Sequence, residues 1–345
     1  MLETAPRVPT AETDADGAPS ALVTFGRRAR QHPLLPLLVL WIAVIVYFAA
    51  TQSRFLHGAN INSMLEQNSV LFTVAMAETI ILLTGAVDLS VGGMLALVSL
   101  VLTLSNHGVP PWLACVMAIA AGGLLSATFN GLPIGLAKMN PFVVTLGTAA
   151  VFAGIANVIT DGNTEVINDP ALINAIASNK VGPIPVAVLV MLGVLGAFWW
   201  MLKYTYYGRN VYAVGGNAEA STLAGISVAR VRIIAFLLLG LAAGLAAILE
   251  AGQLSSVAPT SGTGLELQAV AAVLLGGTML AGGKGGVVGT AVAVLFLGTV
   301  QNGLDISGVS SFWQNVVTGS VLVLAVGFDQ LRQRFFLNRQ SKGTR

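Results

Sequence analysis

Two acidic residues lie inside apolar stretches of the sequence, where a charged side chain is costly. Glu78 lies within one long apolar run, and Asp88 follows Gly85 at the end of that run. A carboxylate at the centre of a bilayer costs at least about 2–3 kcal/mol, so such residues usually face a cavity or a polar partner. The chemistry open to both is a polar lining for a solute or a proton relay.

Each acidic residue also has a plainer interpretation. Asp88 with Ser90, beside a glycine break, suits an N-cap for a helix that starts near Leu89, and we favour this interpretation. For Glu78, an interhelical hydrogen bond and a functional lining are favoured equally. Three further acids, Glu66, Glu250 and Glu266, lie near the ends of predicted spans and are expected to reach headgroups or water.

A second polar group begins at Asn140-Pro141. Proline at the first helical turn loses no hydrogen bond, and Asn140 before it can cap the helix. Thr145, Gly147 and Thr148 then form a small polar face. We slightly favour helix packing for this face over a lining of the translocation path.

The most informative polar segment is residues 203–231, which we place in the cytoplasm. Gly215 and Gly216 are predicted to make a turn, after which Asn217 caps a short helix that ends at Gly225. Glu219 complements the positive end of that helix.

The same short helix has a small apolar face, formed by Ala220, Leu223 and Ala224. An apolar face outside the membrane needs a partner, so we favour a coupling helix that docks into another protein. The alternative, a helix lying on lipid, would prefer bulkier residues and more Lys or Arg.

Several kinds of catalytic site are disfavoured. The three histidines are far apart in sequence, which argues against a metal site. The segment Thr278 to Gly285 resembles a phosphate loop but lacks both its first glycine and its Ser/Thr. We interpret it as a tight cytoplasmic turn, and we expect no cofactor to be bound by this chain.

The composition defines the elements that must position these residues. Of 345 residues, 55% are hydrophobic and 9% are charged, against about 25% charged in soluble domains. The fold class is therefore an all-α, polytopic helical membrane protein. The predicted spans, about ten, are 34–50, 64–84, 88–105, 111–130, 141–160, 184–202, 232–250, 266–281, 286–303 and 312–328.

The positive-inside rule gives the orientation. With the amino terminus inside, Arg54 and Lys180 fall outside, and the other 15 of the 17 Lys and Arg residues fall inside. Both termini are then cytoplasmic. Residues 84–93 and 276–289 are glycine-rich and carry a charge, so they are full spans or breaks; eight spans would preserve the same orientation.

The predicted organisation has three parts. Residues 1–30 form a disordered cytoplasmic tail, 31–330 a transmembrane permease domain, and 331–345 a basic cytoplasmic tail. An external loop at 161–183 contains a possible short helix around 170–178. Residues 81–98 and 273–294 share the pattern of an apolar half, a glycine-rich break and a second apolar half. An internal repeat and a chance similarity between glycine-rich apolar sequences explain this pattern equally well.

Several motifs, in order, resemble the permease subunits of bacterial ABC importers for simple sugars of the ribose, xylose and arabinose type. The resemblance covers about residues 60–335. The matching stretches are GAVDLSVGG (85–93), NPFVVTLGT (140–148), YGRNVYAVGGN (207–217), AGI (224–226), SVAPTSGTG (256–264), LGGTMLAGGKGG (275–286) and NG (302–303). The first motif commonly reads GGIDLSVG, so Ala86 and Val87 are a mild departure that keeps Asp88.

The resemblance implies partners that the residues alone do not define. It implies a second permease copy or paralogue, cytoplasmic ATPase subunits that bind ATP and Mg²⁺, and a periplasmic solute-binding protein, all at the bacterial inner membrane. Residues 207–226, including Gly208 and Arg209, would contact the ATPase, and the loops at 161–183 and 253–264 would meet the binding protein.

The function expected is therefore passage of a sugar or similar small polyhydroxylated solute through an ATP-driven importer, without catalysis or nucleic-acid binding by this chain. Related permeases serve other solutes, so the identity of the solute stays open. The alternative is a proton-coupled secondary transporter that uses Glu78 or Asp88 as its relay.

Overall fold

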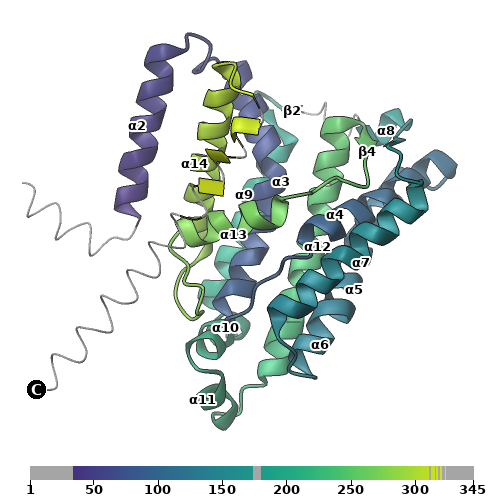
Figure 1. Ribbon diagram of the computed structural model, residues 1–345, viewed down its shortest axis with the longest axis vertical. Helices are drawn as coiled ribbons and strands as arrows, with labels where there is room; N and C mark the ends of the chain where they lie inside the picture. Colours follow the sequence, from purple (N-terminus) through teal and green to yellow (C-terminus); the bar gives the residue numbers. More distant parts are fainter. Residues whose placement is uncertain are drawn as a thin grey trace, which may run out of the picture.

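The computed structural model describes residues 34–173 and 180–310, followed by residues 312–314, 316–317, 319–320 and 323. It is built almost entirely of helices, as the composition predicts (Figure 1). The two predicted tails, 1–30 and 331–345, lie outside the described residues. The predicted span at 312–328 is described only in part.

Five helical stretches in the described residues are long and apolar enough to cross a membrane. They are Pro111–Gly135 (α5 Pro111–Leu125, the π-helix η2 Ser126–Gly131 and α6 Leu132–Gly135), α7 Pro141–Thr160, α9 Val186–Tyr204, α12 Val228–Leu254 and α14 Val287–Ile306. α3, Gly58–Leu83, also has sufficient length, about 39 Å at 1.5 Å per residue, but its first half is polar.

Three apolar helical stretches are shorter. They are α2 Leu35–Thr51, α4 Val91–Ser99 with the 3₁₀ turn η1 Leu100–His107, and α13 Leu265–Leu275. α13 spans only about 16 Å, half the thickness of the hydrocarbon core, so the predicted crossing at 266–281 is wrong as a continuous helix. The predicted count of ten spans is not confirmed.

The two doubtful segments are breaks. Residues 84–90 connect α3 to α4 without helix, and residues 276–286 connect α13 to α14 in the same way. The two predicted half-span patterns therefore share a helix–break–helix arrangement. The second break packs against the end of α3, where the Gly283 N–H donates a hydrogen bond of 3.0 Å to the Leu83 carbonyl. It also touches the first break, because a Cβ on Gly282 would lie 2.9 Å from the Gly85 Cα.

α7 shows how local sequence sets a helix boundary. The Asn140 side chain accepts a hydrogen bond of 2.9 Å from the Phe142 N–H, and Pro141 is the first helical residue. The helix ends at Thr160, where Asp161 adopts a left-handed conformation. The predicted cap and the predicted range 141–160 are both confirmed.

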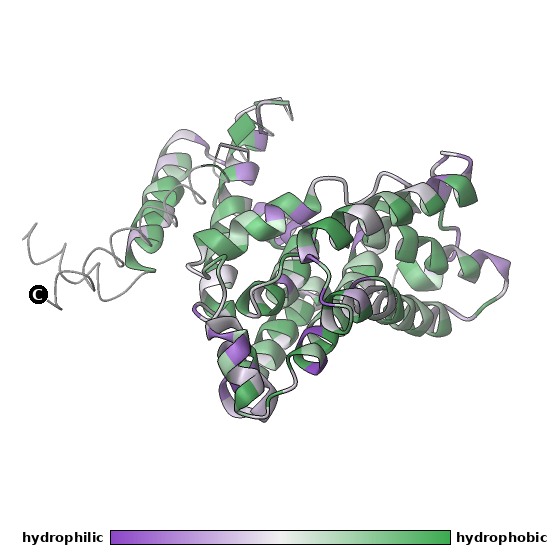
Figure 2. Cartoon of the chain, turned by 60° about the horizontal axis from the view of Figure 1, so that its bottom comes forward, coloured by the Kyte–Doolittle hydropathy of each residue, from purple (hydrophilic) through white to green (hydrophobic). Residues whose placement is uncertain are grey.

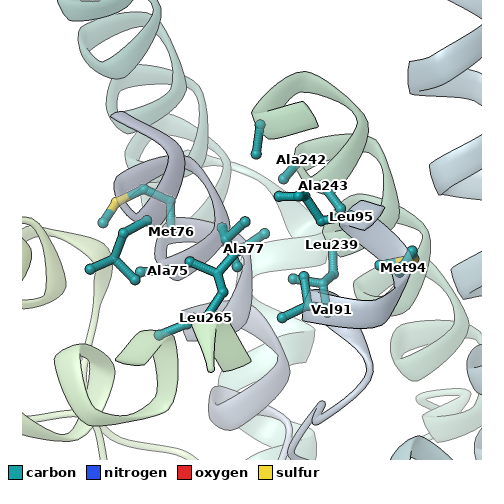
Figure 3. Packing of buried hydrophobic residues seen from close by; sticks show 14 of the residues in the cluster. Ala75, Met76, Ala77, Val91, Met94, Leu95, Leu239, Ala242, Ala243 and Leu265 are labelled. Atoms are coloured by element: carbon teal, nitrogen blue, oxygen red, sulfur yellow. The ribbon is translucent and has the colours of Figure 1, made fainter. Parts of the chain in front are cut away.

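α12 is the central helix. In its most apolar window 61% of residues are buried, against 17% in α9. α12 packs against α5 at Gly122 and Gly240, where a Cβ on either residue would collide with the carbonyl of the other. Small residues at such crossings let helix backbones approach closely in lipid. Figure 3 shows Leu239, Ala242 and Ala243 of α12 packed in the resulting core.

The periphery follows the membrane pattern. Figure 2 shows hydrophobic residues along the helices and hydrophilic residues mainly at their ends and in the loops. The outer face of α7 exposes Phe142, Val143 and Leu146, as expected for contact with lipid tails. α2 lies at the edge of the molecule beside α14 (Figure 1), where the Trp41 indole donates a hydrogen bond of 2.9 Å to Thr299.

At one end of the molecule, the predicted external loops meet. β1, Glu165–Val166, pairs antiparallel with β4, Ser256–Val257. α8, Pro170–Ile173, lies within the predicted short helix, and residues 174–178 of that prediction lie outside the described residues. β2, Lys180–Val181, and β3, Ile184–Pro185, form a second small pair.

At the opposite end lie α10, Tyr206–Gly216, and α11, Ala218–Leu223 (Figure 1). The predicted turn at Gly215-Gly216 is wrong, because α10 continues through both residues. The chain turns at Asn217, whose backbone is extended.

Candidate functional site

Asp88 is the centre of a buried polar cluster. Its carboxylate accepts hydrogen bonds from the Ser90 N–H and from the Ser90 hydroxyl, the latter at 2.8 Å. Both residues are fully buried. The prediction that Asp88 is the N-cap is wrong, because α4 starts at Val91, two residues later than predicted, and its N-cap residue is Ser90, which makes no side-chain capping bond. Asp88 instead holds Ser90 in the turn before the helix.

Asn130 connects the Asp88–Ser90 pair to two further helical elements. Its amide donates to Asp88 Oδ2 at 3.0 Å and to Ser90 Oγ at 2.7 Å, and its carbonyl oxygen accepts from the Thr148 hydroxyl at 2.6 Å. Asn130 lies in the π-helix η2, a rare form that often occurs at functional sites. Asn130 was not among the predicted site residues; its one mark in the sequence is that it is a lone amide within an apolar run.

Glu78 lies against the same cluster from α3. Its Oε1 accepts a hydrogen bond of 3.1 Å from the Asp88 N–H, while its Oε2 is buried without a hydrogen-bond partner among the described residues. The Thr145 hydroxyl donates to the Pro141 carbonyl at 2.9 Å and lies 3.5 Å from the Val87 carbonyl. The cluster therefore joins α3, the first break, η2 and α7.

The six residues proposed for a translocation path do not all meet. Glu78, Asp88 and Ser90 lie together with Thr148, and Thr145 lies beside them. Asn140 is exposed and serves as the cap of α7. Glu78, Asp88, Ser90 and Thr145 have no exposed surface. The cluster therefore joins neighbouring helices to one another and does not line an open path.

The predicted coupling helix is confirmed as a structural element. The Asn217 side chain accepts a hydrogen bond of 2.9 Å from the Ala220 N–H, and Gly225 follows the helix with φ of +82°. Leu223 is 91% exposed, and Ala220 and Ala224 are exposed beside it. The apolar face of α11 is therefore uncovered in the single chain.

The other residues of this segment have distinct positions. Glu219 lies exposed in the first turn of α11. The Arg209 guanidinium lies 4.3 Å from the centre of the Tyr206 ring. Gly208 is buried at the corner between α9 and α10, where a Cβ would collide with the backbone of Leu202. Burial raises the pKa of Tyr207, so its hydroxyl stays protonated and donates to the Val231 carbonyl at 3.1 Å.

α10 contacts both helix breaks, and we call this contact the glycine junction: Leu83–Gly85, Gly215–Gly216 and Gly282–Gly283. A Cβ on Gly215 would collide with the Leu83 carbonyl, and one on Gly283 would lie 2.7 Å from the Gly216 nitrogen. The Tyr212 hydroxyl also donates to the Gly285 carbonyl at 3.1 Å. A displacement of α10 therefore acts directly on both breaks.

The segment that resembles a phosphate loop is a tight turn, as predicted. The Met279 N–H donates to the Lys284 carbonyl at 2.9 Å, and the Gly286 N–H donates to the Thr278 hydroxyl at 3.2 Å. The turn packs through its glycines against α10.

Known proteins of similar sequence cover nearly the whole chain. The ribose import permease protein of Bacillus subtilis is 41% identical over 306 residues, which cover 86% of this chain and 92% of the relative. The D-allose transport system permease protein of Escherichia coli is 36% identical, covering 85% and 90%. The L-arabinose ABC transporter permease protein of Azospirillum brasilense is 32% identical, covering 86% and 87%. No solved structure matches the chain.

The family match spans the elements described above. Residues 60–326 match the family described as "Branched-chain amino acid transport system / permease component". That range begins in α3 and includes both breaks, the polar cluster, α10 and α11. The resemblance to importer permeases noted from the sequence is confirmed, and the chain belongs to this permease family.

Proposed function

We propose that this chain is the membrane-spanning subunit of an ATP-driven importer for a sugar or a similar small polyhydroxylated solute. The observation that carries the proposal is the identity of 32–41% to permeases named for ribose, allose and arabinose, over more than 80% of the chain. The chain acts as a transport subunit, and a partner ATPase binds ATP and Mg²⁺.

The exposed face of α11 supports the assignment of the ATPase contact. Leu223 and its small neighbours present an apolar surface of the size of one helix turn, which a partner groove can cover. In this proposal α10 and α11 lie on the cytoplasmic side of the bacterial inner membrane, both termini are cytoplasmic, and a second permease copy or paralogue completes the pathway.

The paired loops at the other end support the contact with a solute-binding protein. The β1–β4 pair joins residues 165–166 to 256–257, so the two loops form one surface. Solute arrives there, and ATP-driven movement of α11 acts through α10 and the glycine junction on the two breaks. A conformational change of the two breaks then switches access to the translocation pathway from one side of the membrane to the other.

Reconstitution with the partner ATPase and the binding protein tests this proposal. Wild-type complex in proteoliposomes should take up D-ribose, D-allose or L-arabinose only with ATP. Leu223→Glu should lower uptake at least tenfold while the ATPase stays active, because a buried charge without a partner weakens docking. Thr222→Glu, an adjacent exposed position, is the matched charge control and should retain most uptake.

The proton-coupled alternative has its own assay. The chain alone, reconstituted without the ATPase, should not take up sugar when a pH gradient is applied across the membrane. Uptake under that condition, or unchanged uptake by a correctly assembled Leu223→Glu complex, would contradict the proposal.

A further inference from the structure

A cavity of about 310 Å³ lies between α3, α12, α13 and α14. Its volume is in the range of small-molecule pockets, which begins near 300 Å³. Much of its lining is polar, and includes Gln67, Asn68, Glu250, Gln268, Gln301 and Asp305.

The cavity lies far from the coupling helix. Gln67 precedes Leu83 of the glycine junction by 16 residues of one helix, or about 24 Å at 1.5 Å per residue. The α12 residues that line the cavity lie next to β4, which belongs to the paired external loops. The cavity is therefore at the end where the solute would arrive.

Several polar groups in this cavity are unused. Glu250 Oε2 is buried without a hydrogen-bond partner among the described residues. The side-chain amides of Gln67, Gln268 and Gln301 likewise make no hydrogen bond within the described part of the chain. An unmade hydrogen bond is costly for the buried Glu250 oxygen. Gln67 and Gln301 are exposed and Gln268 is half-buried, so their amides can bond a polar ligand that enters the cavity.

Other amides nearby differ, because the protein already engages them. Asn302 exchanges two hydrogen bonds with Asn60, at 2.9 and 3.0 Å. The Gln253 amide donates to the Glu66 carbonyl at 2.6 Å. The unused groups are thus a subset of the lining.

The types of the unused groups define the ligand chemistry. An amide both donates and accepts hydrogen bonds, as a sugar hydroxyl does, and a carboxylate accepts from hydroxyls. No lysine or arginine is among the described residues that line the cavity. An amino acid or a phosphate would leave its anionic group without a cationic partner there.

We infer that this cavity is a binding site for a neutral monosaccharide on its way through the permease. The inference deepens the proposed function and rests on it. Gln67, Gln268 and Gln301 contact hydroxyl groups of the solute from three helices, and Glu250 accepts from a hydroxyl with its free oxygen.

The route beyond the cavity is closed by apolar packing. Val74 and Ala75, the next turn of α3, are fully buried. Leu265, a lining residue, lies in the same packed group as Ala75 and Ala77 (Figure 3). A solute held at this site therefore waits until the helices rearrange.

Thiol labelling tests occupancy directly. Cys115 is the only cysteine, so a Cys115→Ser background leaves one thiol when Gln301→Cys is added. In the assembled complex, D-ribose, D-allose or L-arabinose at high concentration should slow labelling of position 301 by a methanethiosulfonate reagent at least threefold. Asn157→Cys, on the exposed face of α7, is the matched control and should label at an unchanged rate.

Transport variants test the contacts. Gln301→Trp should reduce ATP-driven uptake at least tenfold by filling the cavity, and Asn157→Trp should not. Gln268→Leu and Gln301→Leu should each lower uptake about threefold to tenfold, the value of one hydrogen bond. A variant that has lost its hydrogen bond to one hydroxyl should take up the deoxy-sugar that lacks this hydroxyl as well as it takes up the complete sugar.

The outcomes separate the two proposals. A wild-type complex without ATP-driven sugar uptake contradicts the proposed function. A complex that takes up one of these sugars, yet whose thiol at position 301 is unprotected by it and whose Gln301→Trp variant transports normally, overturns the assignment of the cavity alone.

Discussion

The two helix breaks look alike in sequence and are built in opposite ways. The first, residues 84–90, buries polar side chains, and Asp88 and Ser90 bond through them to neighbouring helices. The second, residues 276–286, turns mainly through its glycines: Gly277, Gly282, Gly283 and Gly285 have positive φ, and Lys284 is exposed. Its Thr278 hydroxyl adds one local hydrogen bond, from the Gly286 N–H.

The two breaks should therefore be sensitive to different kinds of substitution. The first depends on side chains that are present, so removing one should damage it. The second depends on side chains that are absent, so adding one should damage it. Variants of the two breaks can therefore test this difference.

The largest effect is expected for Asp88→Leu. It leaves the Ser90 N–H and one bond of the Asn130 amide unmade, which should destabilise the fold by about 3 kcal/mol. Thermal unfolding of the purified protein in detergent measures the loss. Asp88→Asn combined with Asn130→Asp restores a donor facing an acceptor; if the pair is no more stable than Asp88→Asn alone, the cluster does not act as described.

The next effect is expected where the breaks meet. Gly215→Ala places a methyl group against the Leu83 carbonyl and should cost about 1–3 kcal/mol. It should also reduce ATP-driven uptake more than ATP hydrolysis. Gly216→Ala, which meets no atom within 4 Å, is its control, and equal effects of the two would contradict the packed junction.

A smaller effect is expected inside the second break. Gly283→Ala combines a strained left-handed conformation with a contact on Gly216, whereas Gly277→Ala has the strain without the contact. Both should lose about 1–2 kcal/mol from the conformation, and Gly283→Ala should lose more. Chemical denaturation in mild detergent can compare them; a Gly277→Ala variant that is the less stable of the two would refute this ranking.

The smallest effect is expected for Lys284→Ala. The side chain is exposed, and substitutions at such positions usually stay within about 0.5 kcal/mol. Unfolding should shift little, in contrast to the neighbouring glycine. A Lys284→Cys variant, labelled from one side of intact vesicles in a Cys115→Ser background, also tests the proposed cytoplasmic location of this turn.

The sequence predicted local features well because their causes are local. Asn140 and Pro141 fix the start of α7, and Asn217 fixes the start of α11, through bonds to residues two or three positions away. Gly215 and Gly216 misled the prediction because their helical state depends on packing against the Leu83 carbonyl, which lies 132 residues earlier in the chain.

The polar sites were only half predictable for the same reason. Glu78 and Asp88 stand out as charges in apolar sequence, but Asn130 is neutral and its partners lie far away in the sequence, in the first break and on α7. The cavity was missed altogether, because Gln67, Glu250 and Gln301 come from helices far apart in sequence and each one alone resembles a polar residue near a helix end.

The β1–β4 pair has a consequence for how this surface can change over time. Its register is held by backbone hydrogen bonds, and the side chains of Glu165 and Val166 are exposed. Their identities are therefore free to vary without loss of the pairing. The surface that we propose to face a solute-binding protein can therefore diversify between related transporters while the helices beneath it keep their arrangement.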